Sequence, residues 1–324
     1  MSLATRVGAR LGAEEPDPSA TTGLAAVRPP RGRRKTGDGR AAFWFLLPWT
    51  AGLVVITLGP MLGSLALSFT EYNLIQPPEF VGGENYERLL SDSRLHNSLL
   101  VSFLYVFISV PLQLALSLGL AIVLDRGMRG LSFYRSVFYL PSMLGGSVAI
   151  AILWRQIFGN DGLVNQVLRV FGIEAPGLVT TPDTALSTLI LLNVWTFGAP
   201  MVIFLAALRQ IPAMYYEAAK VDGATARQRF FRITLPLLTP IIFFNLVLQL
   251  IHAFQAFTQA FIVSNGTGGP ADSTMFMTLY LYQQAFTRFD MGYASAVAWL
   301  LMIVIAAITA ANFFFSRYWV FYDD

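Results

Sequence analysis

The chain has 324 residues, of which 55% are hydrophobic and only 13% are charged. A soluble domain carries about 25% charged residues, so this composition excludes an ordinary soluble protein and indicates a membrane protein. The sequence contains no cysteine, which excludes disulfides, thiolate metal sites and cysteine nucleophiles.

The first 40 residues are rich in Pro, Gly, Ser and Arg and contain no long apolar run. A cleaved signal peptide requires such a run, so residues 1–40 are predicted to be a disordered, basic cytoplasmic tail. Its basic cluster consists of Arg28, Arg31, Arg33, Arg34, Lys35 and Arg40. Beside a membrane span, such a cluster orients the chain and attracts anionic lipid. Nucleic-acid or partner binding is the alternative, and we expect no nucleic acid.

Six apolar segments follow, and each exceeds the roughly 20 residues needed to cross the hydrocarbon core. A span in lipid must satisfy its own backbone, so all six are predicted to be helices. The predicted spans cover residues 41–69, 99–124, 137–158, 185–208, 235–263 and 291–315. Residues 41–324 are therefore predicted to form an all-α, six-span membrane domain.

The distribution of Arg and Lys predicts how the chain is oriented. The two tails and the loops at 125–136 and 209–234 hold 17 of the 22 basic residues. Because basic residues accumulate on the cytoplasmic side, both termini and the 209–234 loop are predicted to be cytoplasmic.

The 209–234 loop carries more helix signals than an ordinary connector. Pro212 fits the first turn of a helix, where its missing N–H costs nothing. That helix is predicted to run from Ala213 to Asp222 and to end at Gly223, a residue type that terminates helices.

A second short helix is predicted to follow at once. Thr225 and Gln228 have the spacing of a capping box, and the helix is expected to reach about Arg232. Ile233-Thr234-Leu235-Pro236 is then expected to turn the chain back into the membrane. Two short helices at an angle would form a compact element that a groove in a partner can hold.

Glu217-Ala218-Ala219, then Gly223, then Ile233-x-Leu235-Pro236 is a pattern that resembles the EAA loop of binding-protein-dependent ABC importer permeases. The resemblance implies that residues 209–234, the coupling loop, dock on a separate ATPase and that Glu217 takes part in that contact. An amphipathic connector is the alternative. The residues that the resemblance assigns to coupling are Glu217, Ala218, Ala219, Asp222, Gly223, Arg227, Ile233, Leu235 and Pro236.

Three further stretches, at 68–73, 80–86 and 289–296, are similar to the carbohydrate-uptake branch of these permeases, the maltose- and glycerol-phosphate-type members. The resemblance implies the type I ABC importer permease fold in a bacterial or archaeal cytoplasmic (inner) membrane. It implies a second homologous permease, two ATPase subunits, and an extracytoplasmic binding protein that delivers a sugar, a di- or oligosaccharide. ATP and magnesium would belong to the ATPase, and no cofactor is expected here, since neither Lys35 nor Lys220 lies in a phosphate-binding loop.

Polar residues on the fifth predicted span mark a candidate substrate path. At 100° per residue they form one stripe about 120° wide, and amides and imidazole are costly against lipid. Such side chains can bind sugar hydroxyls, or they can hold the bundle together through interhelical hydrogen bonds. The candidates, including one from span four, are Asn245, Gln249, His252, Gln255, Gln259 and Asn193. Just outside span six lie four further residues, which could meet the sugar but are expected to belong to an interfacial aromatic belt: Tyr280, Tyr282, Gln283 and Gln284.

Two other classes of function are weighed against the importer. An ion-coupled secondary transporter needs charged residues inside spans, and the predicted spans hold essentially none except Arg155 near an end. A membrane-embedded enzyme needs clustered acid–base or metal-binding groups, and His96 and His252 are far apart in the sequence. No catalytic residue and no metal site is therefore predicted.

Overall fold

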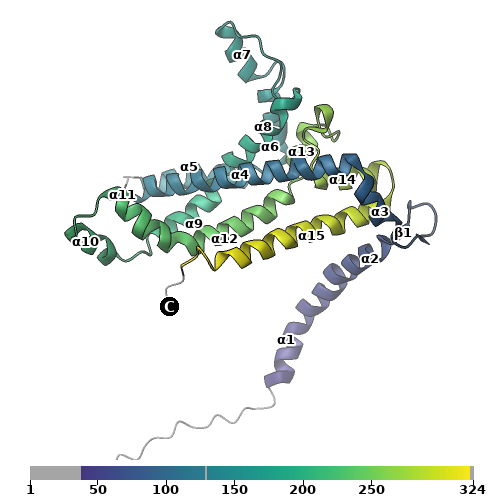
Figure 1. The fold of residues 1–324 in the computed structure, drawn as a ribbon, viewed down its shortest axis with the longest axis horizontal. Coiled ribbons are helices and arrows are strands. Elements are labelled where there is room, and N and C mark those ends of the chain that lie inside the picture. The colour runs from purple at the N-terminus through teal and green to yellow at the C-terminus, as the bar shows by residue number, and fades with distance from the viewer. Residues whose placement is uncertain (1–37, 128–129, 322–324) are drawn as a thin grey trace, which may run out of the picture. The chain divides into compact units, whose positions relative to one another are not determined.

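The computed structural model describes residues 38–127 and 130–321, so the predicted tail at 1–37 lies outside the described part of the chain. The chain divides into two units, residues 1–57 and 58–324. The described part of the first unit is helical from Asp38, in α1 (Asp38–Gly52), and continues in the π-helical segment η1 (Leu53–Leu58) (Figure 1). Helix therefore begins within the predicted tail, three residues before the predicted span.

The second unit is built on long apolar helices. After α2 (Gly59–Leu67) come α4 (Ser93–Asp125), α12 (Leu235–Phe254) and α15 (Met291–Ser316), and these last three run alongside one another (Figure 1). Among the described residues, four helices are long and apolar enough to span a membrane, or up to six if each of two bent pairs is one span. The all-α membrane fold predicted from the sequence is confirmed.

The third predicted span is broken. Helices α5 (Leu131–Leu144) and α6 (Val148–Phe158) belong to a pair bent by 92°, which can count as one broken span, so the segment predicted over 137–158 is interrupted at 145–147. Two consecutive glycines, Gly145 and Gly146, lie at the break, and glycine weakens a helix interior. The hydroxyl of Ser147 then caps the N-terminus of α6.

The fourth predicted span is also broken, into α8 (Pro182–Trp195) and α9 (Gly198–Leu208), which are bent by 40°. A break frees backbone carbonyls, which in lipid need other donors. Gln113 Nε2 and Ser142 Oγ donate to the Thr196 carbonyl at 3.1 and 2.8 Å, and Ser117 Oγ donates to the Phe197 carbonyl at 2.9 Å. Gln113 is buried, and its amide stabilises the helix break.

The connections between spans carry structure of their own. A short antiparallel hairpin pairs β1 (Thr70–Glu71) with β2 (Glu79–Phe80) in the register Thr70 to Phe80. The helical insertions are α3 (Glu84–Ser91), α7 (Leu163–Val170), η3 (Pro270–Asp272), α14 (Met277–Tyr282) and η4 (Gln283–Thr287).

The three stretches that resemble sugar permeases meet at one end of the second unit, the hairpin end, formed by β1, β2, α3 and the start of α15. Asn85 Nδ2 donates to the carbonyls of Ser68 and Thr70 at 3.0 and 2.9 Å. A Cβ added at Gly292 would lie 1.9 Å from the Thr70 carbonyl oxygen. These stretches therefore build the junction of the hairpin, α3 and α15, and glycine at 292 is required for the close approach of two backbones.

Candidate coupling element and transport cavity

The first half of the coupling loop is α10 (Ala213–Val221), which ends as predicted at a glycine. Gly223 has a φ of +74°, in the left-handed region that favours glycine. The backbone N–H of Ala224 donates to the Ala219 carbonyl at 2.9 Å. The turn therefore also supplies a hydrogen-bond donor to a carbonyl group in the last turn of the helix.

The second half begins with the predicted capping box. The N–H of Gln228 donates to Thr225 Oγ1 at 3.3 Å, and the N–H of Thr225 donates to Gln228 Oε1 at 2.8 Å. Helix α11 (Ala226–Arg229) follows and leads into the π-helical segment η2 (Phe230–Thr234).

The predicted turn at Ile233–Pro236 is absent, because η2 runs directly into α12. Helical structure is therefore continuous from Ala226 to Phe254. A proline ring clashes with the carbonyl four residues before it, and a π turn widens the helix at that point. The π turn thus gives a physical reason why Pro236 is tolerated here.

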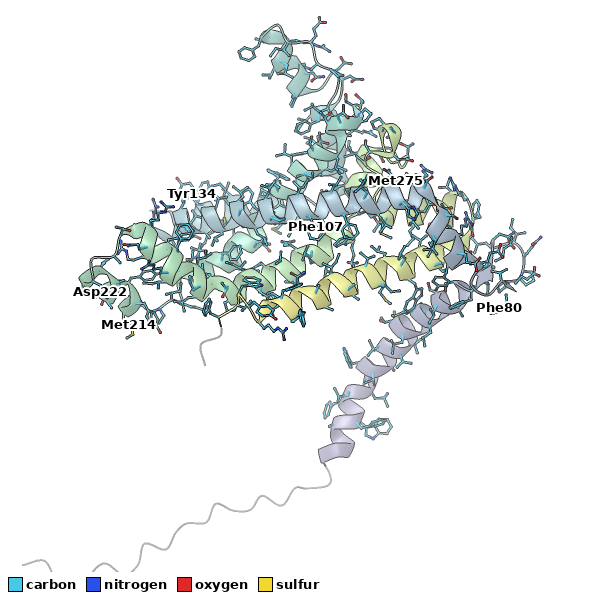
Figure 2. All side chains as sticks on the ribbon, viewed as in Figure 1. Phe80, Phe107, Tyr134, Met214, Asp222 and Met275 are labelled. Carbon is cyan, nitrogen blue, oxygen red and sulfur yellow. The ribbon has the colours of Figure 1, made fainter. Side chains whose placement is uncertain are left out.

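The coupling loop presents most of its assigned residues to solvent at the end of the unit opposite the hairpin. Glu217, Ala218, Asp222, Gly223 and Arg227 are exposed. Figure 2 shows Asp222 at the tip of this end, far from Phe80 in the hairpin. The other four assigned residues are half-buried: Ala219, Ile233, Leu235 and Pro236.

One side-chain hydrogen bond ties α10 back to the membrane helices. The hydroxyls of Tyr216 and Thr234 lie 2.9 Å apart, and the Thr234 side chain is buried. Within the described residues, neither Glu217 nor Asp222 forms an ion pair with the chain itself. The carboxylates of the coupling loop are thus available to a partner surface.

A polar cavity of about 340 Å³ lies within the second unit, between the long helices and two of the helix breaks. Its volume is in the range of small-ligand pockets. Its polar lining holds no carboxylate, ammonium or guanidinium group and consists of Tyr105, Ser142, Asn193, Thr196, Gln249, His252, Gln255, Thr258 and Gln259. Five of the six predicted substrate-path residues thus meet at one cavity.

Three of the predicted residues already have hydrogen-bond partners in the protein. Asn193 Nδ2 donates to Ser109 Oγ at 2.9 Å, and Gln259 Nε2 donates to the Gly145 carbonyl at 3.2 Å. Asn245 is buried, donates to the Ile241 carbonyl of its own helix at 2.9 Å and does not line the cavity. These three amides therefore stabilise the packing of the protein, whether or not they also contact a substrate.

The other three, Gln249, His252 and Gln255, line the cavity, and their side chains form no hydrogen bond with any other described residue. The stripe was drawn on one uninterrupted helix, but α12 ends at Phe254 and α13 (Thr258–Val263) begins only after an interruption at 255–257. Gln255 and Gln259 reach the cavity through the break.

Asp92, for which no role was predicted, organises the hairpin end. Its carboxylate caps α4 by accepting from the N–H groups of Arg94 and Leu95 at 3.0 and 3.1 Å. It also accepts a hydrogen bond from the hydroxyl of Tyr280 and another, at 2.6 Å, from that of Tyr293. Tyr280 is 1% exposed, so its assignment to an interfacial belt is wrong.

An arginine contacts one of these two tyrosines. The Arg88 guanidinium lies 3.9 Å over the Tyr293 ring and pairs with Asp290 at 2.6 Å. Burial disfavours the ionised form of Asp92, but the hydrogen bonds from the two tyrosines and the backbone outweigh it, so its pKa lies below the ordinary value. Burial and the neighbouring Asp92 raise the pKa of Tyr280 to about 12.

The sequence around Asp92 carries a local signal for a helix N-cap. Its hydrogen-bond partners Tyr280 and Tyr293, in contrast, lie far away in the sequence. Asp followed by a helix start is a common N-cap pattern, and α4 begins at Ser93, six residues before the predicted span. Within the described chain, no group of three or more His, Asp or Glu side chains is arranged to hold a metal ion.

Comparison with known proteins agrees with this architecture. Residues 90–319 match the family described as "Binding-protein-dependent transport system inner membrane component". The probable ABC transporter permease protein YesP of Bacillus subtilis (strain 168) is 50% identical over 93% of this chain and 98% of its own length. The lactose transport system permease protein LacF of Rhizobium radiobacter is 33% identical over 84% of this chain and 93% of its own.

One solved structure, that of a bacterial alginate ABC transporter in complex with an alginate pentasaccharide-bound periplasmic protein, matches with a TM-score of 0.73. It covers 87% of this chain and 95% of its own, and its sequence identity of 22% supports a shared fold alone. The family match covers most of the chain, and the helices of that region include α4, α9, α12 and α15. The chain belongs to the family of binding-protein-dependent transport system inner membrane components.

Proposed function

We propose that this chain is one of two permease subunits of an ATP-driven importer that carries a di- or oligosaccharide into the cytoplasm. The observation that carries the proposal is the exposed coupling loop, in which α10 and α11 are held at a fixed bend by Gly223. The loop offers unpaired carboxylates at Glu217 and Asp222, and its shape suits a groove on a partner ATPase.

The orientation of the chain follows from the same proposal. With 17 of the 22 basic residues on one side, the coupling loop and both termini lie in the cytoplasm. The hairpin end then faces outward, toward the binding protein that gives the family its name. ATP and magnesium would be bound by the ATPase, and this chain would do no chemistry.

Two observations, the lining of the polar cavity and the name of a relative, support a saccharide as the transported molecule. The unpartnered amides and imidazole of Gln249, His252 and Gln255 can donate and accept hydrogen bonds, as sugar hydroxyls require. LacF, which is 33% identical, is named as a lactose permease. With a second permease closing the other half of the path, ATP-driven movement of the coupling loops would switch access to this cavity.

Ion-coupled transport is disfavoured by the same cavity. Its lining includes no carboxylate or ammonium group to carry a coupling ion, and Arg155 is engaged with the Ile262 carbonyl at 3.3 Å. Uptake by this chain in the absence of any ATPase would establish the ion-coupled alternative.

The direct test is co-purification of the ATPase with Glu217→Lys. Reversing this exposed charge should abolish ATPase capture and saccharide uptake, because a like charge would meet the partner's cation. Glu79→Lys is the matched control, since Glu79 is exposed on β2 at the hairpin end. Equal ATPase capture by both variants would refute the assignment of the coupling loop.

A further inference from the structure

A second cavity, of about 730 Å³, lies where the coupling loop meets the ends of the membrane helices. We propose that this interface cavity binds the phosphate group of an anionic phospholipid. Its lining comes from α4, α9, α10, α11 and η2: Ile122, Asp125, Arg126, Leu208, Tyr216, Lys220, Ala226, Arg229, Phe230 and Thr234.

Charge is the first observation. Three cationic side chains line the interface cavity: Arg126 at the end of α4, Lys220 on α10 and Arg229 on α11. Within the described residues, none of the three forms an ion pair, whereas Asp125, the only carboxylate in the lining, pairs with Arg209 at 3.4 Å. Arg229 is half-buried, and a partly buried cation without a counter-ion is unfavourable. We therefore expect the cavity to bind an anion.

Position is the second observation. The apolar run of α4 ends at Asp125 and that of α9 at Leu208, so the cavity lies where hydrocarbon gives way to headgroups. Figure 1 shows α10 and α11 at this end of α4.

The apolar lining is the third observation. Ile122 and Leu208 belong to the last turns of membrane helices, and the Phe230 ring joins them from η2. These side chains suit the glycerol and first acyl carbons of a lipid better than the hydrated surface of a docked protein. Basic pockets between membrane helices at a bilayer surface recognise anionic headgroups in this way.

The consequence for the molecule is a bridge between elements. A phosphate bound by Arg126, Lys220 and Arg229 would join α4 to both helices of the coupling loop. It would add a charged contact to the link already made by Tyr216 and Thr234, whose hydroxyls lie 2.9 Å apart in the same cavity. Anionic lipid would therefore hold the coupling loop against the membrane helices.

Native mass spectrometry of the full chain in detergent, titrated with phosphatidylglycerol or phosphatidylcholine, tests the proposal. Wild-type protein is expected to retain one phosphatidylglycerol and to release phosphatidylcholine. The triple variant Arg126→Gln, Lys220→Gln, Arg229→Gln should bind phosphatidylglycerol about a hundredfold more weakly, or about fivefold per removed charge. Arg232→Gln is the matched control, because Arg232 is exposed on η2 and does not line this cavity.

Two further measurements keep the result unambiguous. The single variant Arg229→Lys keeps the charge and should retain the lipid, which separates loss of binding from loss of folding. Equal retention of the two lipids, or equal retention by the triple variant and Arg232→Gln, would overturn the proposal. Displacement of the lipid by millimolar inorganic phosphate would assign the cavity to soluble phosphate, and displacement by the ATPase would assign it to that protein; either result rejects the lipid.

Discussion

The two ends of the second unit are built in opposite ways. At the hairpin end, Asp92 accepts four hydrogen bonds, and Arg88 and Arg94 form ion pairs with Asp290 and Asp272. At the coupling end, the residues that resemble the EAA loop are mostly exposed, and a single pair of hydroxyls, Tyr216 and Thr234, joins α10 to η2. These three carboxylates at the hairpin end are paired within the chain, whereas Glu217 and Asp222 of the coupling loop form no ion pair with any described residue.

The difference indicates which changes should affect folding and which should affect transport. Substitutions at the hairpin end remove contacts that the chain makes with itself, so they should lower its stability. Substitutions at the coupling end would affect the proposed contacts with the ATPase, so they should lower uptake with little loss of stability. The predictions below test this division, from the largest expected effect to the smallest.

The largest effect is expected for Gly292→Ala. Its added methyl group would lie 1.9 Å from the Thr70 carbonyl oxygen, which is backbone and has little freedom to move. Separating α15 from the hairpin should cost about 3 kcal/mol of unfolding free energy, measured by thermal melting in detergent. Gly119→Ala on α4 is the control, since a Cβ there meets nothing within 4 Å and the helix should gain slightly. Similar melting temperatures for the two variants would contradict the close approach of the Gly292 and Thr70 backbones.

Asp92→Asn should have the next largest effect. The amide can still accept from the backbone of α4, but it loses the charge that strengthens the bonds from Tyr280 and Tyr293. Replacing these charge-assisted bonds should cost about 2 kcal/mol in the same melting experiment. Asp161→Asn serves as the control, because the Asp161 side chain is 90% exposed in its ion pair with Arg169.

The pH dependence gives an independent check on Asp92. Because its pKa is lowered in the folded state, the ionised carboxylate stabilises the fold fully above the unfolded pKa of about 4. That stability is lost as the pH falls from there through the folded pKa. As the pH is lowered below about 4, the melting temperature of the wild type should therefore fall more steeply than that of Asp92→Asn. Parallel curves for the two proteins would show that Asp92 is not held in its ionised form.

Gly223→Val tests the coupling end. A branched side chain at a φ of +74° is strained by about 1–2 kcal/mol, yet the space around this position is open. We expect saccharide uptake to be lost while the melting of the membrane helices changes little, because the bend between α10 and α11 is local. Gly223→Asn should restore uptake, since Asn tolerates this conformation. Uptake by Gly223→Val at the wild-type rate would show that the bend is not needed.

The smallest effect is expected in the transport cavity. Gln249→Ala removes one unpartnered amide, and loss of one neutral hydrogen bond to a substrate weakens binding by about 1 kcal/mol, or about fivefold in uptake at low substrate concentration. Stability should not change, because this amide has no partner among the described residues. Asn312→Ala is the matched control, since its amide donates to the Ile308 carbonyl of its own helix at 2.9 Å. Equal uptake by the two variants would place the substrate elsewhere.

The sequence was most informative where the determining signals are local. The end of α10 at Gly223 and the capping box of Thr225 and Gln228 depend on neighbouring residues, and both were predicted correctly. The existence and type of the long helices follow from apolar runs that are longer than the bilayer requires.

The sequence was least informative where distant residues decide the structure. The break at Thr196 is stabilised by Gln113 and Ser142, which lie on other helices and cannot be paired with it from hydropathy. Asp92 meets Tyr280 and Tyr293 across 188 and 201 positions of sequence. For the same reason, the stripe of polar residues was drawn on one helix although α12 ends at Phe254.

The uninterrupted helix from Ala226 to Phe254 has a mechanical consequence. At a rise of 1.5 Å per residue it is a rod about 40 Å long, with the second half of the coupling loop at one tip and Gln249 and His252 near the other. A tilt of about 5° about one tip would displace the other by about 4 Å, which is close to the diameter of a sugar ring. A change of tilt at the coupling loop would therefore displace Gln249 and His252 at the cavity, and it would also shift the packing of α12 against α4 and α15.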